Sequence, residues 1–300
     1  MTKIIAVVGT TASGKSDLGV QLAKKYGGEI VSCDSRQVYR GLDLGSGKIT
    51  AEEMQGVPHH LLDVCETGDF YSLAAYQPQA YAALDDIASR GRLPFLVGGT
   101  GLYAQAVLDG YSLSDREPDL SYRDELEQLD TQTLYDMLMR VMPDCTVERQ
   151  NRNRVMRYLE KIHDGDPGHE PNKPRYDSLR LGVAFDRETL KERIDSRLEK
   201  RVESGMIEEV AELLKKGVSP EFLTKLGLEY KYLTWYLTGI IPDKKEMLSL
   251  LSRDIKRFAK RQMTWFKRDK SIHWLNMTED PIEEACGLID RFLLENPLDF

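Results

Sequence analysis

Residues 4–16 join a short apolar run to a glycine-rich loop, and this junction constrains the fold more than any other stretch. The run IIAVV at 4–8 leads directly into GTTASGKS at 9–16, which is followed by a helix-like stretch over 17–26. A strand, the motif G-x-x-x-x-G-K-[ST] and a helix, in this order, form the phosphate-binding P-loop pattern. Its glycines let successive backbone N–H groups face one anionic centre, and the helix N-terminus adds its positive dipole. A chance glycine-rich turn would not need both flanks, so the sequence predicts a phosphorylated ligand, without deciding whether it is a nucleotide.

Each position of this loop has a use in binding an anion. Lys15 supplies a mobile ammonium for phosphate oxygens, and Ser16 supplies a hydroxyl that suits Mg²⁺. Mg²⁺ is therefore the cofactor that the sequence predicts, with Ser16 as its protein ligand. The residues expected to bind the phosphate groups are Gly9, Thr10, Thr11, Ala12, Ser13, Gly14, Lys15 and Ser16.

Composition narrows the class of protein. A length of 300 residues with 41% apolar residues is enough for a substantial core, in one large domain or two smaller ones. The cysteines form no CxxC pair, which argues against a structural zinc or a disulfide scaffold and fits a reducing compartment. The apolar run at 4–8 is too short for a secretory signal, and no apolar stretch approaches the roughly 18 residues of a membrane span. We expect a cytoplasmic protein without a membrane partner.

Charge distribution bears on a nucleic-acid partner. The formal net charge of −8 counts only weakly against one, because binding depends on where the basic side chains lie. Residues 149–161 hold five basic side chains against one glutamate, and residues 253–270 hold eight against two aspartates, together with three aromatic residues. Each segment is either an amphipathic helix with a solvated face or a basic track for a phosphate backbone.

Strand and helix patterns alternate over the first third of the chain. Apolar runs predict strands over 4–8, 29–33 and 93–98, and helices are predicted over 16–25 and 73–90. Such alternation indicates an α/β fold with a parallel, doubly wound sheet flanked by helices. A sheet of this kind binds ligands at the carboxyl ends of its strands.

The remainder of the chain changes character. Residues 114–144 are charged and helical without a strand signal, which predicts an inserted helical element. A strand returns at 179–185, and from residue 188 the pattern is helical throughout, with an apolar stripe over 190–202 and an adjacent flank of arginines at the same i, i+4 spacing. We divide the chain into a P-loop core domain at 1–113, a helical insertion at 114–150 and a continued core at 151–300 with a largely helical C-terminal part.

A carboxylate follows the second predicted strand. Asp34 has the position that P-loop kinases use near their metal, so a small-molecule kinase is one hypothesis. The residues beside it, Ser35, Arg36 and Gln37, indicate another chemistry. Gln can read the N6 and N7 edge of adenine, and Asp can accept a proton from an amine. A structural cap or a metal partner is the alternative role for Asp34.

Seven blocks occur in one order along the chain. They are GTTASGKS at 9–16, DSRQVYRGLDLGSGK at 34–48, VPHHLLD at 57–63, LVGGTGLYAQAVLDG at 96–110, RVMRYLE at 154–160, RIDSRLEKRVESGMIEEV at 193–210 and RQMTWFKR at 261–268. In these blocks the chain resembles the tRNA dimethylallyltransferases (tRNA isopentenyltransferases) of the bacterial type, without the zinc finger of eukaryotic relatives. The blocks cover nearly the whole chain, and the first, second and fourth together are specific where the P-loop alone is not.

The resemblance implies an enzyme that transfers a dimethylallyl group from dimethylallyl diphosphate to the exocyclic N6 of the adenosine 3′-adjacent to the anticodon of tRNA. The P-loop then holds the donor's diphosphate rather than ATP. This fits, because a leaving diphosphate needs the same N–H groups, lysine and Mg²⁺ as a nucleotide. The implied partner is the tRNA anticodon stem-loop, whose target adenine is flipped outward. We expect the enzyme to be a monomer.

The same resemblance implies roles for individual residues. Asp34 is the general base, and Thr100 steers the amine and contacts tRNA; both follow predicted strands and should face the mouth of the P-loop. Arg197 clamps diphosphate oxygens, with surface i, i+4 salt bridges as its alternative. The other implied tRNA contacts are Ser35, Arg36, Gln37, Arg123, Asn153, Arg154, Val155, Met156 and Arg157.

Three departures from the family pattern lie in the second half of the chain. Gly-Leu-Glu-Tyr at 227–230 replaces Gly-Tyr-Lys/Arg-Glu, Gln-Asn at 150–151 replaces Asn-Asp, and Arg201 stands where Met is common. They concern how tRNA is held and leave the donor site untouched. Two rival interpretations remain: a nucleoside or small-molecule kinase, which ATP·Mg²⁺ would stabilise, and a non-catalytic P-loop module, for which Asp34 would be dispensable.

Overall fold

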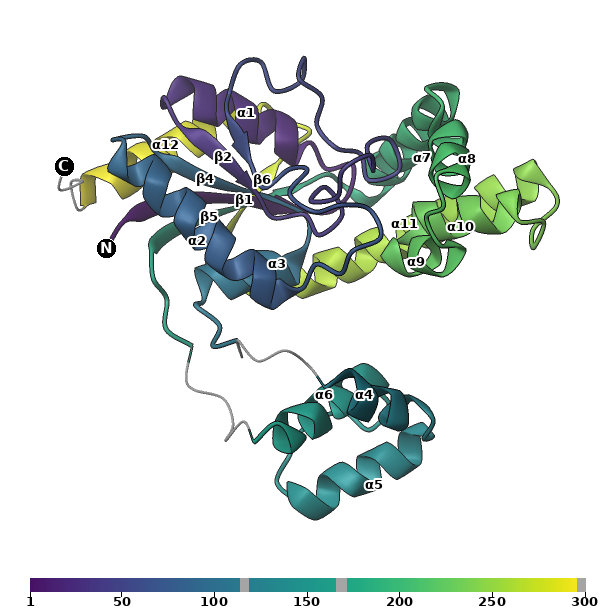
Figure 1. The fold of residues 1–300 in the computed structure, drawn as a ribbon. Coiled ribbons are helices and arrows are strands. Elements are labelled where there is room, and N and C mark those ends of the chain that lie inside the picture. The colour runs from purple at the N-terminus through teal and green to yellow at the C-terminus, as the bar shows by residue number, and fades with distance from the viewer. Residues whose placement is uncertain (114–118, 166–171, 296–300) are drawn as a thin grey trace. The chain divides into compact units, whose positions relative to one another are not determined.

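The computed structural model describes residues 1–113, 119–165 and 172–295. The chain forms two compact units, of which the first combines Met1–Gly110 with Pro174–Phe300 and the second is Tyr111–Lys173 (Figure 1). Within the described ranges, no helix combines the length and the apolar character that crossing a membrane requires.

A six-stranded parallel sheet forms the centre of the first unit, in the order β3-β2-β4-β1-β5-β6. The central strand β1 pairs with β4 and β5 and is buried over its whole length, as parallel strands covered on both faces are. The predicted α/β fold class is confirmed, and four predicted strands correspond to β1, β2, β4 and β5. The strand bounds are β1 Lys3–Gly9, β2 Glu29–Ser32, β3 His59–His60, β4 Pro94–Gly98, β5 Asp177–Ala184 and β6 Ile272–Asn276.

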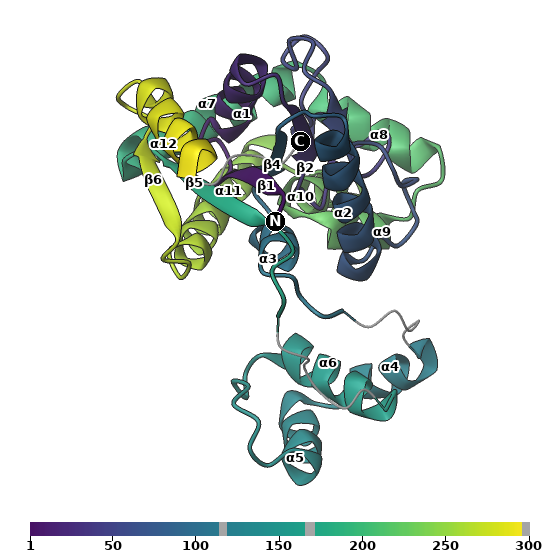
Figure 2. The same ribbon diagram turned by 90° about the vertical axis from the view of Figure 1, so that its left-hand side faces the viewer.

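Helices cover both faces of this sheet (Figures 1 and 2). Successive side chains of β1 alternate between two hydrophobic cores, because neighbouring residues of a strand point to opposite faces. One core is closed by α1 (Lys15–Lys25) and α12 (Pro281–Glu295), and the other by α2 (Leu73–Ser89), α3 (Gly101–Leu108) and the end of α11 (Lys244–Phe266).

A separate core belongs to the helices after β5. The predicted apolar stripe lies on α7, where Ile194 and Leu198 are buried in this core. Gly205, with φ 99°, ends the stripe and begins the next helix in a left-handed conformation that favours glycine. The helices are α7 (Arg187–Glu203), α8 (Met206–Lys215), α9 (Pro220–Leu226), α10 (Leu228–Leu237) and the first part of α11.

The prediction of helix throughout from residue 188 is wrong at β6. This strand extends the sheet by pairing in parallel with β5, with Gly182 opposite Trp274. A side chain at Gly182 could not fit, because a Cβ there would lie 2.5 Å from Ile272 and 2.9 Å from Trp274. The five-residue strand is stabilised by a partner about 90 positions earlier in the chain, and such non-local pairing leaves little periodic signal in so short a segment.

The second unit is a three-helix cluster. Its helices are α4 (Leu120–Glu127), α5 (Thr131–Val141) and α6 (Arg152–His163), and Leu134, Leu138 and Val155 lie at the centre of its core. The unit reaches Lys173, so it differs from the predicted insertion at 114–150, whose first residue lies outside the described residues. The difference arises because the apolar face of α6 packs against α5 and holds this helix in the insertion.

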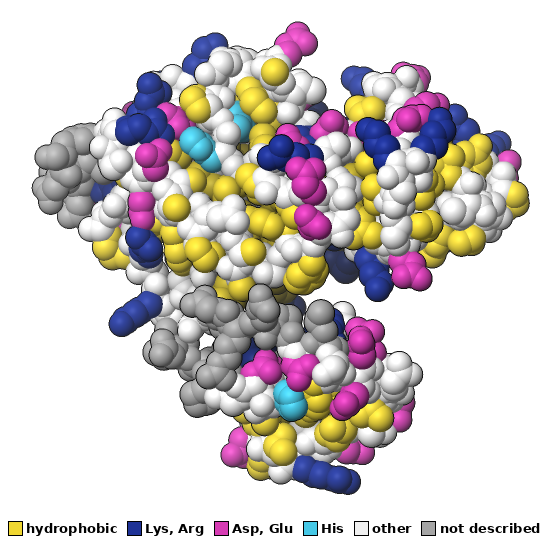
Figure 3. Space-filling model, viewed as in Figure 1, with side chains coloured by type: hydrophobic (Ala, Val, Ile, Leu, Met, Phe, Trp, Pro, Cys, Tyr) yellow, Lys and Arg dark blue, Asp and Glu magenta, His cyan; other side chains and the backbone are white. Residues whose placement is uncertain are grey.

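Charged side chains of both signs are interspersed on the face of the first unit that Figure 3 shows. Ion pairs on the surface of the first unit include Arg90 with Asp86 and Arg175 with Asp85. The net charge of −8 is therefore not spread as one continuous acidic surface over this face.

Candidate active site

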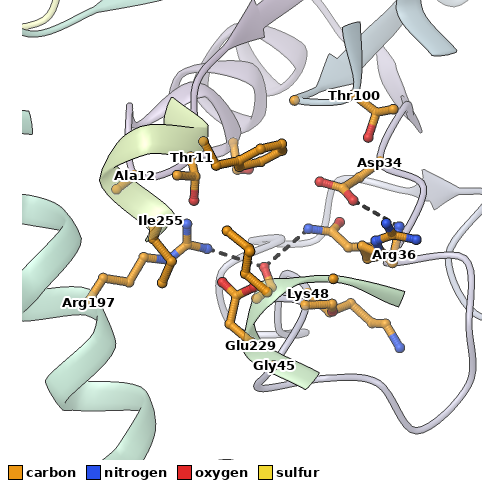
Figure 4. A pocket seen from close by; sticks show the side chains of 18 of the residues that line it. Thr11, Ala12, Asp34, Arg36, Gly45, Lys48, Thr100, Arg197, Glu229 and Ile255 are labelled. Atoms are coloured by element: carbon orange, nitrogen blue, oxygen red, sulfur yellow. Dashed lines mark hydrogen bonds between the residues drawn. The ribbon is translucent and has the colours of Figure 1, made fainter. Parts of the chain in front are cut away.

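The loops that follow β1, β2 and β4 open at the same edge of the sheet. These strands are neighbours in the order β2-β4-β1, so their carboxyl ends lie side by side. Residues 11–17, 34–37 and 99–102 line a cavity of about 1260 Å³, to which α7, α10 and α11 contribute further side chains. Figure 4 shows Asp34, Thr100 and Arg197 in this cavity, each from a separate segment of the chain.

The loop at 9–16 turns tightly before α1 begins. Ala12 and Gly14 have φ of 58° and 83°, in the left-handed region. The first N–H groups of α1 have no acceptor within the helix, so they are available to an anion. Lys15 Nζ donates to the carbonyl oxygen of Thr10 at 3.2 Å, and the buried hydroxyl of Ser13 has no hydrogen-bond partner among the described residues. This geometry suits the anion site that the sequence predicts.

Cationic side chains gather beside this loop. Burial, with a smaller effect of Arg197, lowers the pKa of Lys15 from 10.5 to about 8, against the opposing effect of Asp34. Burial and the neighbouring Arg201 lower the pKa of Arg197 to about 10. Both shifts arise because cations are held away from water and close to like charge. An anion bound among them would reverse both shifts.

Asp34 and Thr100 lie after adjacent strands and are connected through Ser35. The backbone N–H of Ser35 donates to Thr100 Oγ1 at 3.0 Å, and the N–H of Thr100 donates to the carbonyl oxygen of Cys33 at 3.2 Å. Asp34 Oδ1 accepts the backbone N–H of Arg36 at 3.0 Å. These bonds orient the carboxylate, which keeps unused acceptor capacity for a substrate proton.

Gln37 and Arg197 meet at the carbonyl oxygen of Gly47. Gln37 Nε2 donates to it at 3.2 Å and Arg197 Nη2 at 3.4 Å. A dashed line in Figure 4 marks the bond of Arg197. Arg197 thus has a partner inside the cavity, and among the described residues it is not part of a surface salt bridge. Gln37 lines the same cavity, and its amide nitrogen is already engaged.

Two residues of α11 contribute to the site and were not singled out from the sequence. Gln262 accepts the N–H of Thr11 through Oε1 at 3.0 Å and donates through Nε2 to the carbonyl oxygen of Gly99 at 2.8 Å. It therefore joins the 9–16 loop to the loop after β4. Trp265 packs so closely on Gly101 that a Cβ there would lie 2.4 Å from its ring. The block RQMTWFKR at 261–268 contains both residues and is the signal that could have identified them.

The departure at 227–230 places a structural residue beside the cavity. Tyr230 is buried and donates its hydroxyl to Glu209 Oε1 at 3.0 Å. Glu209 also accepts the backbone N–H groups of residues 43–45, at 2.6–3.1 Å. Burial and this carboxylate raise the pKa of Tyr230 well above its ordinary value. Glu209 and Tyr230 together anchor the loop that carries Gly47.

The predicted tRNA contacts of the second unit fall into two groups. Asn153 and Arg154 are exposed on α6. Arg123 and Arg157, whose side chains are 43% and 46% exposed, share the buried Glu160, whose two carboxylate oxygens accept from them at 2.8 and 3.1 Å. These two arginines are therefore anchored by ion pairs to one buried carboxylate, which fixes their position on the unit.

Two of the predicted tRNA contacts need correction. The side chains of Val155 and Met156 are 0% and 3% exposed, because they lie on the apolar face of α6 in the core of the second unit. They support the helix and do not present a side chain to RNA. The departure at 150–151 is accommodated locally, since Asn151 caps α6 by accepting the N–H of Arg154 at 3.3 Å.

Comparison with known proteins gives a consistent result. A family model described as IPP transferase matches residues 37–269, and one described as isopentenyl transferase matches residues 2–67. The chain is similar to a tRNA dimethylallyltransferase 2 of Shewanella sediminis (strain HAW-EB3), with 42% identity over 298 residues that cover 95% of this chain and 97% of the relative.

Solved structures agree with the sequence relatives. The full-length tRNA isopentenylpyrophosphate transferase of Bacillus halodurans is 38% identical, covers 98% of both chains and superposes with a TM-score of 0.77. A eukaryotic dimethylallyltransferase, whose crystal structures describe it acting on tRNA, superposes with a TM-score of 0.84 over 100% of this chain and 81% of its own. At 24% identity, this last likeness bears on the fold alone.

Proposed function

This chain belongs to the IPP transferase family, that of the tRNA dimethylallyltransferases, and from this premise we propose the reaction that it performs. It transfers a dimethylallyl group from dimethylallyl diphosphate to the exocyclic N6 of the adenosine that follows the anticodon on its 3′ side. The C–O bond between the allyl carbon and the diphosphate breaks, a C–N6 bond forms, and the diphosphate leaves with the electron pair. The observation that carries the proposal is the shared cavity in which a cationic 9–16 loop faces the carboxylate of Asp34.

The donor's diphosphate binds to the 9–16 loop. The free N–H groups at the start of α1, the ammonium of Lys15 and the guanidinium of Arg197 all face the cavity that would hold it. Charge develops on the leaving oxygen as the bond breaks, and fixed cationic donors stabilise that charge most in a site removed from water. The lowered pKa values of Lys15 and Arg197 support this assignment, since both groups gain from an anion.

Asp34 accepts the proton that N6 loses, and Thr100 orients the amine. The two residues are tied together through Ser35, so a substrate amine can reach both. A positioned general base contributes roughly 10²–10⁴ in rate. Gln37 and Arg36 follow Asp34 in the chain and line the same cavity, which supports a role for both in contacting the adenine and its neighbouring nucleotides.

Mg²⁺ fits the chemistry of this site as a partner of the diphosphate. Among the described residues, no group of three or more His, Cys, Asp or Glu side chains is placed to hold a metal ion. Mg²⁺ commonly takes most of its ligands from substrate phosphates and water. The hydroxyl of Ser16 lines the cavity and would hold the ion there, where it would neutralise charge on the diphosphate.

The RNA substrate is the tRNA anticodon stem-loop. Its target adenine must leave the stack to reach Asp34 in the cavity, as enzymes that modify a base require. Exposed basic residues of 149–161 and 253–270, such as Arg154 and Lys260, would hold the phosphate backbone. The enzyme acts as a monomer in the cytoplasm.

Mass spectrometry of bulk tRNA from cells with and without this protein tests the proposal. Loss of N6-(dimethylallyl)adenosine at the position after the anticodon is expected, and unchanged tRNA would refute it. A thermal-shift comparison separates the kinase alternative, because dimethylallyl diphosphate with Mg²⁺ should stabilise the protein more than ATP with Mg²⁺ does. The non-catalytic alternative would leave product formation absent in the wild-type protein.

A further inference from the structure

Two guanidinium groups of α7 converge on Gly47. A Cβ built on this glycine would lie 1.5 Å from Arg201 Nη2 and 2.5 Å from Arg197 Nη2, so the two nitrogens lie within about 4 Å of each other. Gly47 has φ 63° and no side chain, and it leaves the space that both groups occupy. Arginines one helical turn apart would ordinarily separate to reduce repulsion. Here the packed loop at 43–48 and α7 hold them together.

The pair has only long contacts with carboxylates. Arg201 Nη1 lies 3.7 Å from Glu229 Oε1, a distance too long for a hydrogen bond, and the two side chains are 13% and 21% exposed. The partner that Arg197 has at Gly47 is a carbonyl oxygen at 3.4 Å. The more distant carboxylates of Asp34 and Glu53 also act on Arg197. Within the described residues, however, no carboxylate lies within hydrogen-bond distance of either guanidinium group, which leaves two closely spaced cations without a direct anionic partner.

The pair is also continuous with the 9–16 loop. A small hollow beside the main cavity is lined by Thr11 and Ala12 of the loop and by Arg197, Arg201 and Glu229. Arg201 lines the main cavity as well. The guanidinium group of Arg201 therefore faces the same space as the 9–16 loop, which would hold the diphosphate.

We propose that Arg201 is a second guanidinium ligand of the donor's diphosphate, acting with Arg197 on its terminal phosphate, and that Glu229 holds Arg201 in place until the donor binds. This inference deepens the proposed function and rests on it. It also moves Arg201 from the tRNA side, where the sequence placed it, to the donor side. Two guanidinium forks can meet separate oxygens of one phosphate, and charge-assisted bonds of this kind are the strong ones. When the donor binds, Glu229 loses its weak contact with Arg201, and the phosphate becomes the partner of Arg201.

Calorimetric binding of inorganic diphosphate with Mg²⁺ to the full chain, without tRNA, tests the assignment. Arg201→Met keeps the length of the side chain and removes the charge, and it should weaken diphosphate binding about tenfold or more. Arg201→Lys should weaken binding less, because a single ammonium replaces the fork. Glu229→Gln should tighten binding about threefold, because it removes the competing negative charge at the same shape. Arg187→Met, on the exposed first turn of the same helix, is the matched control and should bind as the wild type does.

The Arg201 and Glu229 variants are expected to change diphosphate affinity in opposite directions, and this distinguishes a ligand from a structural ion pair. If Arg201→Met binds diphosphate within twofold of the wild type, or if Glu229→Gln weakens binding as much as Arg201→Met does, the inference is overturned. Loss of affinity for an anticodon stem-loop RNA with unchanged diphosphate binding would also overturn it, in favour of a tRNA phosphate. Absence of diphosphate binding in the wild-type protein would refute the proposed function itself. Thermal unfolding of each variant checks the fold, and Arg201→Lys with Glu229→Gln decides the question if Arg201→Met does not fold.

Discussion

Lys15 gives the sharpest test of an anion site, because its charge in the free protein depends on pH near neutrality. Its pKa of about 8 lies below the ordinary 10.5, since burial and Arg197 disfavour the charged form. A bound diphosphate places negative charge beside the ammonium and raises the pKa again. Donor binding is therefore expected to take up protons at pH values around and above 8.

The size of the effect follows from this pKa. In the free protein about half of the Lys15 side chains are charged at pH 8 and about one in ten at pH 9. If Lys15 stays protonated in the complex, affinity for dimethylallyl diphosphate falls about fivefold from pH 8 to pH 9, and about half a proton is taken up per site at pH 8.

Calorimetry of donor binding at pH 7, 8 and 9, in two buffers with different ionisation enthalpies, measures both quantities. Lys15→Arg is the control, because an arginine remains protonated over this range and should remove the pH dependence. An affinity that does not change between pH 7 and pH 9 would refute the reasoning. The same fall in affinity for Lys15→Arg would assign the titration to another group.

The same pKa shift predicts a stability change in the free protein. Because the unfolded chain binds more protons than the folded chain between about pH 8 and 10.5, the free energy of unfolding rises with pH over that window. Lys15→Met removes the desolvated charge and is expected to stabilise the free protein by about 1–2 kcal/mol at pH 7 while it abolishes donor binding. Chemical denaturation without ligand measures the first effect, and calorimetry measures the second.

Three further predictions concern other parts of the site. Asp34→Ala is expected to remove nearly all prenyl transfer, a loss of roughly 10²–10⁴ in rate, while tRNA affinity stays within a few-fold; more than a tenth of wild-type activity would exclude Asp34 as the base. Gln262→Leu leaves the N–H of Thr11 without its partner and should cost about 1–3 kcal/mol of stability and raise KM for the donor; an unchanged unfolding midpoint and KM would contradict the bridging role. Replacing Arg154 and Lys260 together with Ala should lower the log–log salt slope of tRNA binding by roughly one to two units, whereas identical slopes would show that these exposed residues touch no phosphate.

Sequence alone determined the parts of the site that are encoded in contiguous residues. The run 4–16 fixes a strand, a tight loop and a helix start, because apolar β-branched residues, the left-handed φ of Gly14 and a following helical stretch each act on the local backbone. The sequence also predicted that Asp34 and Thr100 lie near this loop, since a parallel sheet brings the carboxyl ends of neighbouring strands together.

Only the tertiary structure decided the features that depend on distant partners. Pairing with β5 makes β6 a strand, and packing against α5 turns Val155 and Met156 inward and holds α6 in the second unit. The sequence offered an amphipathic helix at 149–161 as one alternative, but it did not identify the surface against which the apolar face of that helix would lie, because that choice depends on chain closure over many residues.

The same limit applied to the charges of the cavity. Arg197 and Arg201 recur on α7 at a spacing that solvated surface arginines share, and Gln262 lies more than two hundred residues beyond the loop that it joins. Spacing along a helix determines which side chains share a face. The packing of separate segments determines what that face meets, which here is Gly47 and Glu229. The same packing determines whether a row of arginines is solvated or lines a site for an anion.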